Sequence, residues 1–185
     1  QNNSKEFRTP TNCPECGTAV VKPAEEAMHR CPNASCPAQF FELLKHFVSK
    51  SAINIDGLGE QWCRILVDQG LVTDLAELYS LKKDQLLQLD RMGQKLAGKI
   101  IDNIEDSKNK PLSKLIFALG IFHVGSEVAE MLTQVYAQIE EVADATIEEL
   151  SRIPGIGPKI ATSIVSYFQV DANKAVIDKL RAAGV

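Results

Sequence analysis

Four cysteines near the start of the sequence are the residues most suited to chemistry. Cys13, Cys16, Cys31 and Cys36 follow the spacing C-x2-C-x14-C-x4-C. Two short pairs separated by a longer span are typical of a tetrahedral Zn²⁺ site, because each pair supplies two thiolates from one turn of the chain. Four thiolates leave no open coordination position for a substrate. We therefore predict one structural zinc ion per chain, whose removal would unfold this module.

Other roles for these cysteines fit the sequence less well. Two disulfides would need an oxidising compartment, and the unpaired fifth cysteine, Cys63, and the lack of a secretion signal argue against one. An iron–sulfur cluster stays open, although the spacing is not a common ferredoxin pattern. His29 lies two residues before Cys31, but with four thiolates at hand we expect it to be a surface residue. Residues 18–22 are expected to form a short strand of a hairpin.

A repeated glycine pattern organises the rest of the chain. Apolar residues recur there at three- and four-residue spacing, which is typical of helices. Four segments, which we call hairpins one to four, align on their glycines at residues 55–59, 89–93, 121–125 and 153–157. Their last glycines are 34, 32 and 32 residues apart. Each segment predicts a helix, a tight hairpin and a second helix.

Two further positions in each unit predict how its helices pack. The apolar residue between the two glycine positions is expected to fill the gap between the helices, and is Leu58, Met92, Val124 or Ile156. The residue four positions after the last glycine is small and is expected where the helices cross closely. It is Cys63, Ala97, Ala129 or Ala161. Cys63 is thereby assigned a packing role and not that of a reactive thiol.

Capping signals define helix boundaries and complete the predicted fold. Thr146 and Glu149 are spaced as a capping box, Gly70 is expected to end a helix, and Pro111 is expected to start one. The predicted fold class is mainly α. It comprises a linker at residues 1–12, a small four-cysteine zinc-finger module at 13–40, and an all-α domain of four helix-hairpin-helix repeats at 41–185.

The hairpins predict anion binding. Unpaired N–H groups at a helix start, together with the helix dipole, attract anions. Four evenly spaced sites suit the phosphates of a nucleic-acid backbone, and such contacts position a protein without reading sequence. Hairpin three is expected to be the weakest, because it has His123 at its first glycine position and lacks the basic residues of hairpin two. The candidate DNA-binding residues are Gly57, Gly59, Gln61, Arg91, Gly93, Lys95, Lys99, Gly125, Ser126, Gly155, Gly157 and Lys159.

The overall charge of −4 does not by itself indicate a nucleic-acid binder. Counted by segment, residues 1–50 carry +1, residues 82–114 carry +3 and residues 127–149 carry −7. The acidic excess is therefore local, and we expect it on a solvated face or one turned to another domain, with modest DNA affinity. No apolar run approaches the roughly 18 residues of a membrane span. The start at Gln1, without a signal segment, indicates a piece of a longer polypeptide.

These motifs together resemble a known family. The cysteine module and four hairpins, with the strings Leu44-Lys-His-Phe-Val-Ser49, Asn54-Ile-Asp-Gly-Leu-Gly59 and Leu119-Gly-Ile121, are similar to the zinc-finger and helix-hairpin-helix region of bacterial NAD⁺-dependent DNA ligases. The resemblance covers the chain from about Arg8. It implies a monomer in the bacterial cytoplasm that grips the minor-groove side of duplex DNA around a nick, without sequence preference, in DNA replication and repair.

The resemblance also implies neighbouring domains and cofactors. In this family, upstream adenylation and OB-fold domains seal the nick with NAD⁺ and Mg²⁺, and a BRCT domain usually follows. Residues 1–12 would then lead from the OB-fold domain, which the zinc module would brace against the helical domain. The family's nucleophilic lysine lies in a Lys-x-Asp-Gly motif. The nearest string here, Asn54-Ile-Asp-Gly57, has Asn in place of Lys, so this chain alone is expected not to adenylate anything.

Two other functions remain open from the sequence. A base-excision glycosylase would place a catalytic Asp after a Gly-hydrophobic-Gly hairpin, and Asp178 lies 19 residues after Lys159. Such enzymes carry one hairpin, not four, and we expect Asp178 to be a solvated residue on the last helix. The other alternative is a non-catalytic module that binds protein. Base release from damaged duplex would indicate the first, and no duplex affinity at low salt would exclude DNA binding.

Overall fold

The chain is built from short helices joined by tight hairpins, and the computed structural model describes residues 10–22 and 28–185. Over these residues it contains ten α-helices, one 3-10 helix (η1) and two isolated β-bridges. The helices are α1 (Pro37–Val48), α2 (Glu60–Asp68), η1 (Leu75–Ser80), α3 (Lys83–Leu86), α4 (Gln94–Ser107), α5 (Leu112–Ala118), α6 (Ser126–Thr133), α7 (Ile139–Asp144), α8 (Ile147–Ser151), α9 (Pro158–Phe168) and α10 (Asp171–Ala182). The predicted mainly α fold is confirmed, and no described helix is long and apolar enough to cross a membrane.

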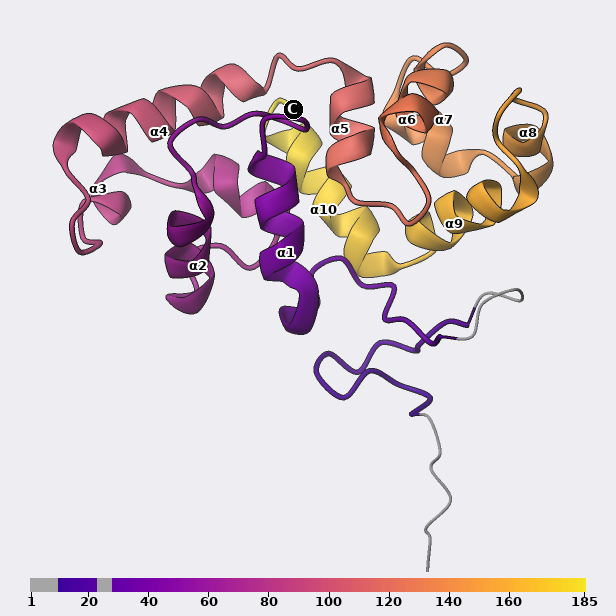
Figure 1. Cartoon of the computed structure of the whole chain (residues 1–185), viewed down its shortest axis with the longest axis horizontal. Helices are drawn as coiled ribbons and strands as arrows, with labels where there is room; N and C mark the ends of the chain where they lie inside the picture. The colour runs from indigo at the N-terminus through magenta and orange to yellow at the C-terminus, as the bar shows by residue number, and fades with distance from the viewer. Residues whose placement is uncertain (1–9, 23–27) are drawn as a thin grey trace, which may run out of the picture.

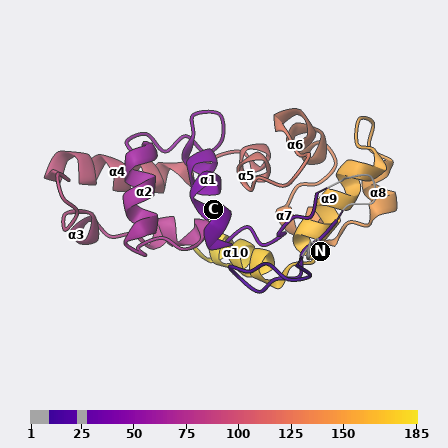
Figure 2. The same cartoon turned by 60° about the horizontal axis from the view of Figure 1, so that its bottom comes forward.

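Four pairs of helices form the repeated units. Hairpin one lies between α1 and α2, hairpin two between α3 and α4, hairpin three between α5 and α6, and hairpin four between α8 and α9. The molecule is elongated, with units one and two at one end and units three and four at the other (Figures 1 and 2). Helices α1 and α10 lie between the two ends, and η1 and α7 belong to the connections between units.

The same two backbone hydrogen bonds fix every hairpin. The apolar residue between the glycine positions donates its N–H to the carbonyl three residues earlier, at 3.0–3.3 Å, in the pairs Leu58–Ile55, Met92–Leu89, Val124–Ile121 and Ile156–Ile153. The small residue donates to the last glycine at 2.9–3.1 Å, in the pairs Cys63–Gly59, Ala97–Gly93, Ala129–Gly125 and Ala161–Gly157. All eight donor residues are buried, and the four small ones have 0% exposure. The predicted packing roles, including that of Cys63, are confirmed.

The first glycine position of each hairpin has a left-handed backbone. Its φ is +94° at Gly57, +63° at Arg91, +66° at His123 and +91° at Gly155. This conformation costs a residue with a side chain about 1–2 kcal/mol. Hairpins two and three therefore keep the shape of the glycine-containing hairpins at a local cost. The last glycine of every hairpin has φ between −72° and −87°, so positive φ is a property of the first position only.

The units pack as two doublets through these first positions. A Cβ atom at Gly57 would lie 3.0 Å from Cγ1 of Ile100, on α4 of unit two. A Cβ atom at Gly155 would lie 2.8 Å from Sδ of Met131, on α6 of unit three. The neighbouring unit thus fills the space where a side chain would stand. Units one and two form one doublet, units three and four form the other, and a hydrophobic core runs through both.

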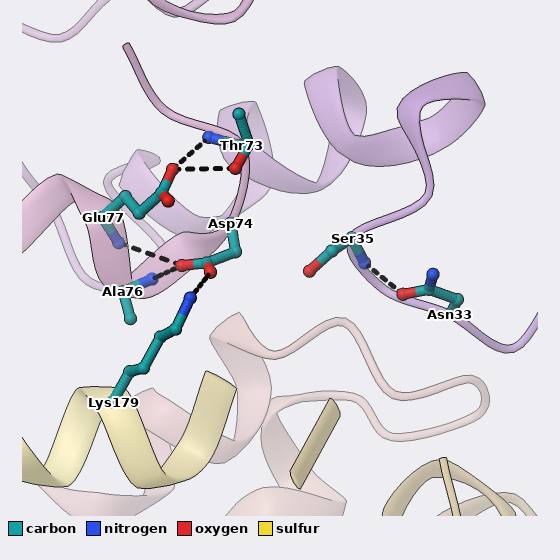
Figure 3. Close-up of polar contacts among 7 residues, drawn as sticks. All are labelled: Asn33, Ser35, Thr73, Asp74, Ala76, Glu77 and Lys179. Atoms are coloured by element: carbon teal, nitrogen blue, oxygen red, sulfur yellow. Dashed lines mark hydrogen bonds and ion pairs between the residues drawn. The ribbon is translucent and has the colours of Figure 1, made fainter. Parts of the chain in front are cut away.

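The last helix joins the two doublets, because α10 packs against both η1 and α9. Lys179 on α10 lies with its Nζ 2.6 Å from Oδ2 of Asp74, whose side chain is almost fully buried (Figure 3). The other carboxylate oxygen of Asp74 accepts from the N–H groups of Ala76 and Glu77 at 2.9 and 3.0 Å, which caps η1. The hydrogen bond to Asp74 raises the pKa of Lys179.

The three predicted helix boundaries are confirmed. Thr146 Oγ1 accepts from the N–H of Glu149 at 3.2 Å, and Glu149 Oε2 accepts from the N–H of Thr146 at 2.8 Å, a capping box that opens α8. Gly70 follows the C-cap of α2 with φ +65°, and Pro111 is the N-cap of α5. Local sequence signals therefore set these ends.

Candidate metal centre and nucleic-acid interface

The four predicted metal-binding sulfur atoms converge. The Sγ atoms of Cys13, Cys16, Cys31 and Cys36 lie within 4.8 Å of one another, and all four thiols are free. Cys13 Sγ is 3.8 Å from Cys36 Sγ, and Cys16 Sγ is 3.4 Å from Cys31 Sγ. A tetrahedron with Zn–S bonds of about 2.3 Å separates its sulfur atoms by about 3.8 Å. The four donors thus form a C4 zinc site and would hold the ion as a structural centre.

Two short turns present these sulfur atoms. In the first, Gly17 has φ +72° and donates its N–H to the carbonyl of Cys13 at 2.8 Å. In the second, the Cys36 N–H donates to the carbonyl of Asn33 at 3.1 Å, and Asn33 Oδ1 accepts from the N–H of Ser35 (Figure 3). The strand expected at residues 18–22 is present among the described residues only as isolated bridges, Asn12–Ala19 and Val21–Arg30. The first bridge is made by two backbone hydrogen bonds, from the Cys13 N–H to the Thr18 carbonyl at 2.8 Å and from the Val20 N–H to the Thr11 carbonyl at 2.9 Å.

The thiols differ in acidity. Hydrogen bonds with the side chain and backbone of Thr18 lower the pKa of Cys16 to about 6. Burial raises the pKa of Cys31 to about 12 and also raises the pKa of Cys36. Metal ligands must be deprotonated, so a zinc ion entering this site displaces protons from the buried thiols.

The zinc module, which we define as residues 12–22 and 28–36, is fixed to the helical domain by Asn173 on α10. The Asn173 side chain is fully buried, and its Oδ1 accepts from the N–H of Ala34 at 2.9 Å. Its Nδ2 donates to the carbonyls of Pro32 at 3.0 Å and Tyr167 at 2.9 Å. The module also reaches hairpin three, where the Arg30 guanidinium lies 3.6 Å from the centroid of the Phe122 ring.

The last glycine of each hairpin is the N-cap of a helix that has no side-chain cap. Gly59, Gly93, Gly125 and Gly157 are the N-caps of α2, α4, α6 and α9, and no side chain caps any of these helices. A Cβ atom added at any of them would meet no atom within 4 Å. The first N–H groups of a helix have no partner inside it. Neither backbone strain nor packing within the described residues requires glycine at these four positions.

Most predicted polar side chains lie near these helix starts. Gln61, Lys95, Ser126 and Lys159 belong to the first turns after the hairpins and are exposed, and Arg91 is exposed in hairpin two. The Arg91 side chain is 85% exposed, with a long 3.7 Å ion pair to Asp90. The structure places two other candidates, Gly57 and Gly155, in the contacts between units, as described above.

Lys99 has a partner within the chain. Its Nζ forms an ion pair with the Asp56 carboxylate of hairpin one, which lowers the pKa of Asp56. Asn103 Nδ2 donates to the Asp56 carbonyl at 2.7 Å. Helix α4 is thereby bound to hairpin one by two side chains. Sequence reasoning did not identify Asp56 or Asn103, since no local signal links residues more than 40 positions apart.

Hairpin three differs from the others in its surroundings. The rings of Phe122 and His123 contact each other with centroids 3.9 Å apart and planes tilted by 54°. The Arg30 guanidinium of the zinc module also lies over the Phe122 ring. Glu127 lies in the first turn of α6, as Glu60 does in the first turn of α2, where Glu60 forms an ion pair with Lys45. The neighbourhood of hairpin three is therefore partly occupied by the zinc module and partly acidic.

The remaining candidates are accounted for by packing and surface contacts. Asp178 is 72% exposed on α10 and lies 3.7 Å from Arg181. His29 is exposed, as expected, and is not among the four clustered ligands. Cys63 is fully buried, and that burial raises the pKa of its thiol to about 11. None of these three residues is arranged as a nucleophile or metal ligand.

Three family models match the chain in the order of its structural parts. Residues 12–38 match the NAD-dependent DNA ligase C4 zinc finger domain. Residues 49–106 match the SAM-like helix-hairpin-helix tandem, and residues 114–177 match the helix-hairpin-helix motif. The two helical matches correspond to the two doublets seen in the structure.

The chain is also similar to curated bacterial DNA ligases. It is 52% identical over 175 residues to the DNA ligase of Dehalococcoides mccartyi, covering 95% of this chain and 26% of that protein. It is 48% identical over 180 residues to the DNA ligase of Halothermothrix orenii, covering 97% and 27%, and 46% identical over 176 residues to that of Geobacter sulfurreducens, covering 95% and 26%. The chain therefore spans about a quarter of the length of these relatives.

Proposed function

We propose that this chain, which resembles the NAD-dependent DNA ligases in its C4 zinc finger and helix-hairpin-helix regions, grips duplex DNA around a nick. The contacts go to the phosphate backbone from the minor-groove side and do not read the base sequence. The observation that carries the proposal is the set of four bare helix N-termini behind Gly59, Gly93, Gly125 and Gly157.

A phosphate explains why these positions are glycine. Nothing within the described residues excludes a side chain there, so in this proposal a bound phosphate is the reason for glycine. Helix N-termini attract anions through their unpaired N–H groups and the positive end of the helix dipole. A side chain at the N-cap would keep a phosphate away from those groups. Contacts to phosphates do not involve the base edges, so this binding mode positions the protein on DNA without sequence preference.

The four hairpins contribute unequally in this proposal. Hairpin two adds the exposed cations Arg91 and Lys95, and hairpin four adds Lys159. Hairpin three contributes least, because Glu127 lies in the first turn of α6 and the hairpin lacks the basic residues of hairpin two. Glu60, in the first turn of α2, forms an ion pair with Lys45. Lys99 acts mainly by holding hairpin one to hairpin two through Asp56.

The zinc centre has a structural part in the same proposal. It holds the second cysteine turn in place, and that turn binds Asn173 at the start of α10, next to the C-terminal end of α9. The nick-sealing chemistry, with its NAD⁺ and Mg²⁺, is assigned to adenylation and OB-fold domains of a longer ligase. In this proposal the chain binds DNA and does not supply the lysine nucleophile for adenylation. Its nearest string to Lys-x-Asp-Gly, Asn54-Ile-Asp-Gly57, has Asn in place of Lys.

The test replaces the N-cap glycines by serine. Serine suits the backbone at Gly59 and Gly157 and is at least as good an N-cap as glycine, so stability is expected to be unchanged or slightly higher. Its hydroxyl would occupy the N–H groups that a phosphate needs. We expect Gly59→Ser and Gly157→Ser each to weaken binding to a nicked duplex by roughly tenfold, the size of one charge-assisted hydrogen bond.

Fluorescence anisotropy over a range of salt concentrations measures this effect. The losses are expected to be the same for duplexes of unrelated sequence, and the wild-type affinity is expected to fall linearly in logarithmic plots against salt. Ala172→Ser on the exposed face of α10 is the matched control and leaves affinity unchanged. Full affinity in both glycine variants would overturn the proposal, and no duplex binding at low salt would favour a protein-binding module.

A further inference from the structure

Hairpin one carries a carboxylate close to the helix N-terminus at which the proposed function puts a phosphate. Asp56 lies three residues before Gly59, the N-cap of α2. The Cα atoms of these two residues are at most about 11 Å apart, because three peptide units separate them. That is close to the Debye length of about 10 Å at 0.1 M salt, and the Asp56 side chain is 70% exposed. An unmatched charge on Asp56 would therefore repel a phosphate at the start of α2.

The same residue is part of the structure of the hairpin. Its Oδ1 accepts from the N–H of Gly57 at 3.0 Å, at the position where φ is +94°. The backbone carbonyl of Asp56 accepts from Asn103 Nδ2 of α4 at 2.7 Å. Neither bond needs a negative charge, since an amide oxygen accepts in the same way. The charge of Asp56 is thus separate from its contribution to the fold.

Lys99 on α4 supplies the opposite charge. Its Nζ forms an ion pair with Oδ2 of Asp56, the carboxylate oxygen that does not bond Gly57. This hydrogen bond and the charge of Lys99 lower the pKa of Asp56, so the carboxylate is ionised at neutral pH. Asn103 lies four residues further along α4 and binds the same hairpin without any charge. Removing the charge of Lys99 therefore leaves one contact between α4 and hairpin one in place.

Lys95 gives α4 a second exposed ammonium group, four residues before Lys99. Residues at this spacing lie on one side of a helix. Lys95 forms no hydrogen bond or ion pair with any residue in the described ranges 10–22 and 28–185. Both views place α4 at the same end of the molecule as α2 (Figures 1 and 2). Lys95 and Lys99 therefore form a natural pair for comparison, because they differ in whether their charge is already matched.

The other hairpins support a neutralising role for Lys99. The second residue of the four hairpins is Asp56, Asp90, Phe122 and Pro154 in turn. In hairpin two, the Nε atom of Arg91 lies 3.7 Å from Oδ2 of Asp90. Hairpins three and four have an uncharged residue at this position. Each hairpin that carries the acid therefore also has a cation beside it.

We propose that Lys99, besides holding two units together, neutralises Asp56 so that hairpin one accepts a phosphate at the start of α2. Lys99 is then a positioning residue, which acts on the phosphate through Asp56 and does not bind it. Lys95 is the residue of α4 that contacts phosphate directly. This inference rests on the proposed function, because it takes the N–H groups behind Gly59 as the phosphate site.

A double-mutant cycle tests the inference by fluorescence anisotropy, with the zinc-loaded chain and a nicked duplex. At about 0.1 M salt, we expect Lys99→Gln to weaken binding roughly fivefold, because it leaves the charge of Asp56 unmatched. Asp56→Asn keeps the oxygen that accepts from Gly57 and removes the charge. Combined with Lys99→Gln, it should restore both the wild-type affinity and the wild-type salt slope, since no phosphate contact is lost. Asp56→Asn alone should tighten binding.

Two controls accompany the cycle. Lys95→Gln should weaken binding and lower the salt slope by about 1, whether residue 56 is Asp or Asn. Lys174→Gln makes the same change at an exposed position of α10 and should leave affinity unchanged. Melting temperatures are measured for every variant. If Lys99→Gln lowers the melting temperature, Lys99→Met, another good helix former, replaces it in both backgrounds.

The outcomes separate this inference from the proposed function. Equal losses from Lys99→Gln with Asp and with Asn at residue 56 would show that Lys99 contacts phosphate and would overturn the inference. Unchanged affinity in Lys99→Gln would also overturn it. If Gly59→Ser weakens binding and the cycle shows no coupling, only this inference is wrong. If the cycle shows coupling and Gly59→Ser binds normally, the charge pair acts on DNA but the phosphate does not lie at the start of α2.

Discussion

Asn173 and Ala34 are joined by a 2.9 Å hydrogen bond across 139 residues of sequence. The Asn173 amide uses its oxygen for Ala34 and its nitrogen for Pro32 and Tyr167. One buried side chain thus connects the second cysteine turn, the end of α9 and the start of α10. Through these bonds, Asn173 holds the zinc module against the C-terminal end of α9.

Removing the Asn173 side chain should therefore cost more than an ordinary surface substitution. Asn173→Ala loses three hydrogen bonds and leaves buried backbone groups unpaired, so we expect a loss of about 3 kcal/mol in the free energy of unfolding. Urea unfolding of the zinc-loaded protein measures it. Lys174→Ala, at the exposed neighbouring position, is the control and should change stability little. Equal unfolding midpoints for the two variants would show that the Asn173 contacts are not structural.

The two glycines of hairpin one should respond differently to the same substitution. Serine at Gly57 must adopt φ +94° and place its Cβ 3.0 Å from Ile100, so we expect Gly57→Ser to destabilise the fold by about 2 kcal/mol. Serine at Gly59 meets open space at φ −72°. Thermal unfolding of both variants tests the contrast. Similar melting temperatures would contradict the assignment of Gly57 to packing between units and of Gly59 to an open helix N-terminus.

Loss of the metal should propagate into the helical domain. We expect one zinc ion per chain by native mass spectrometry and its removal by a strong chelator. Because Pro32 and Ala34 lie in the second cysteine turn, its collapse should also break the contacts of Asn173 and lower the melting temperature followed by circular dichroism. Replacing Cys36 by serine should act like the chelator. A metal-free chain that melts like the zinc form would exclude a structural metal.

Cys63 should make stability depend on pH in the alkaline range. Burial raises the pKa of its thiol from 9.0 to about 11, so between these values the unfolded chain releases a proton that the folded chain retains. Stability is then full below about pH 9 and falls as the pH rises towards 11. Cys63→Ala should remove this part of the decline, because alanine occupies the equivalent position in the other three units. Tyr79 and Tyr167, whose pKa values burial also raises, are common to both proteins and cancel. Parallel stability curves for the two proteins would contradict this account.

Local and periodic features of the fold could be predicted from the sequence. The cysteine spacing predicted which four sulfur atoms meet, and the glycine register predicted four hairpins with buried residues between the glycine positions. The capping box at Thr146 was likewise readable, because its donors and acceptors lie three residues apart. In each case the interacting groups are neighbours in the chain, or the pattern repeats.

Features that depend on long-range packing could not be predicted. The sequence around Gly57 does not indicate that Ile100 fills the space beside it. The sequence around Lys99 does not indicate that it forms an ion pair with Asp56. The left-handed backbones of Arg91 and His123 were also unexpected, since residues with side chains rarely adopt them. The shape of the repeated hairpin overrides the preference of the individual residue at these two positions.

The contacts of Gly57 and Gly155 follow a reversed order along the chain. In the first doublet a side chain of the later unit fills the space beside the glycine of the earlier unit. In the second doublet a side chain of the earlier unit fills the space beside the glycine of the later unit. A doublet copied end to end would repeat the same order twice. The order of roles along the chain is instead palindromic, because the hairpins whose glycine is covered by a neighbour are the first and the fourth.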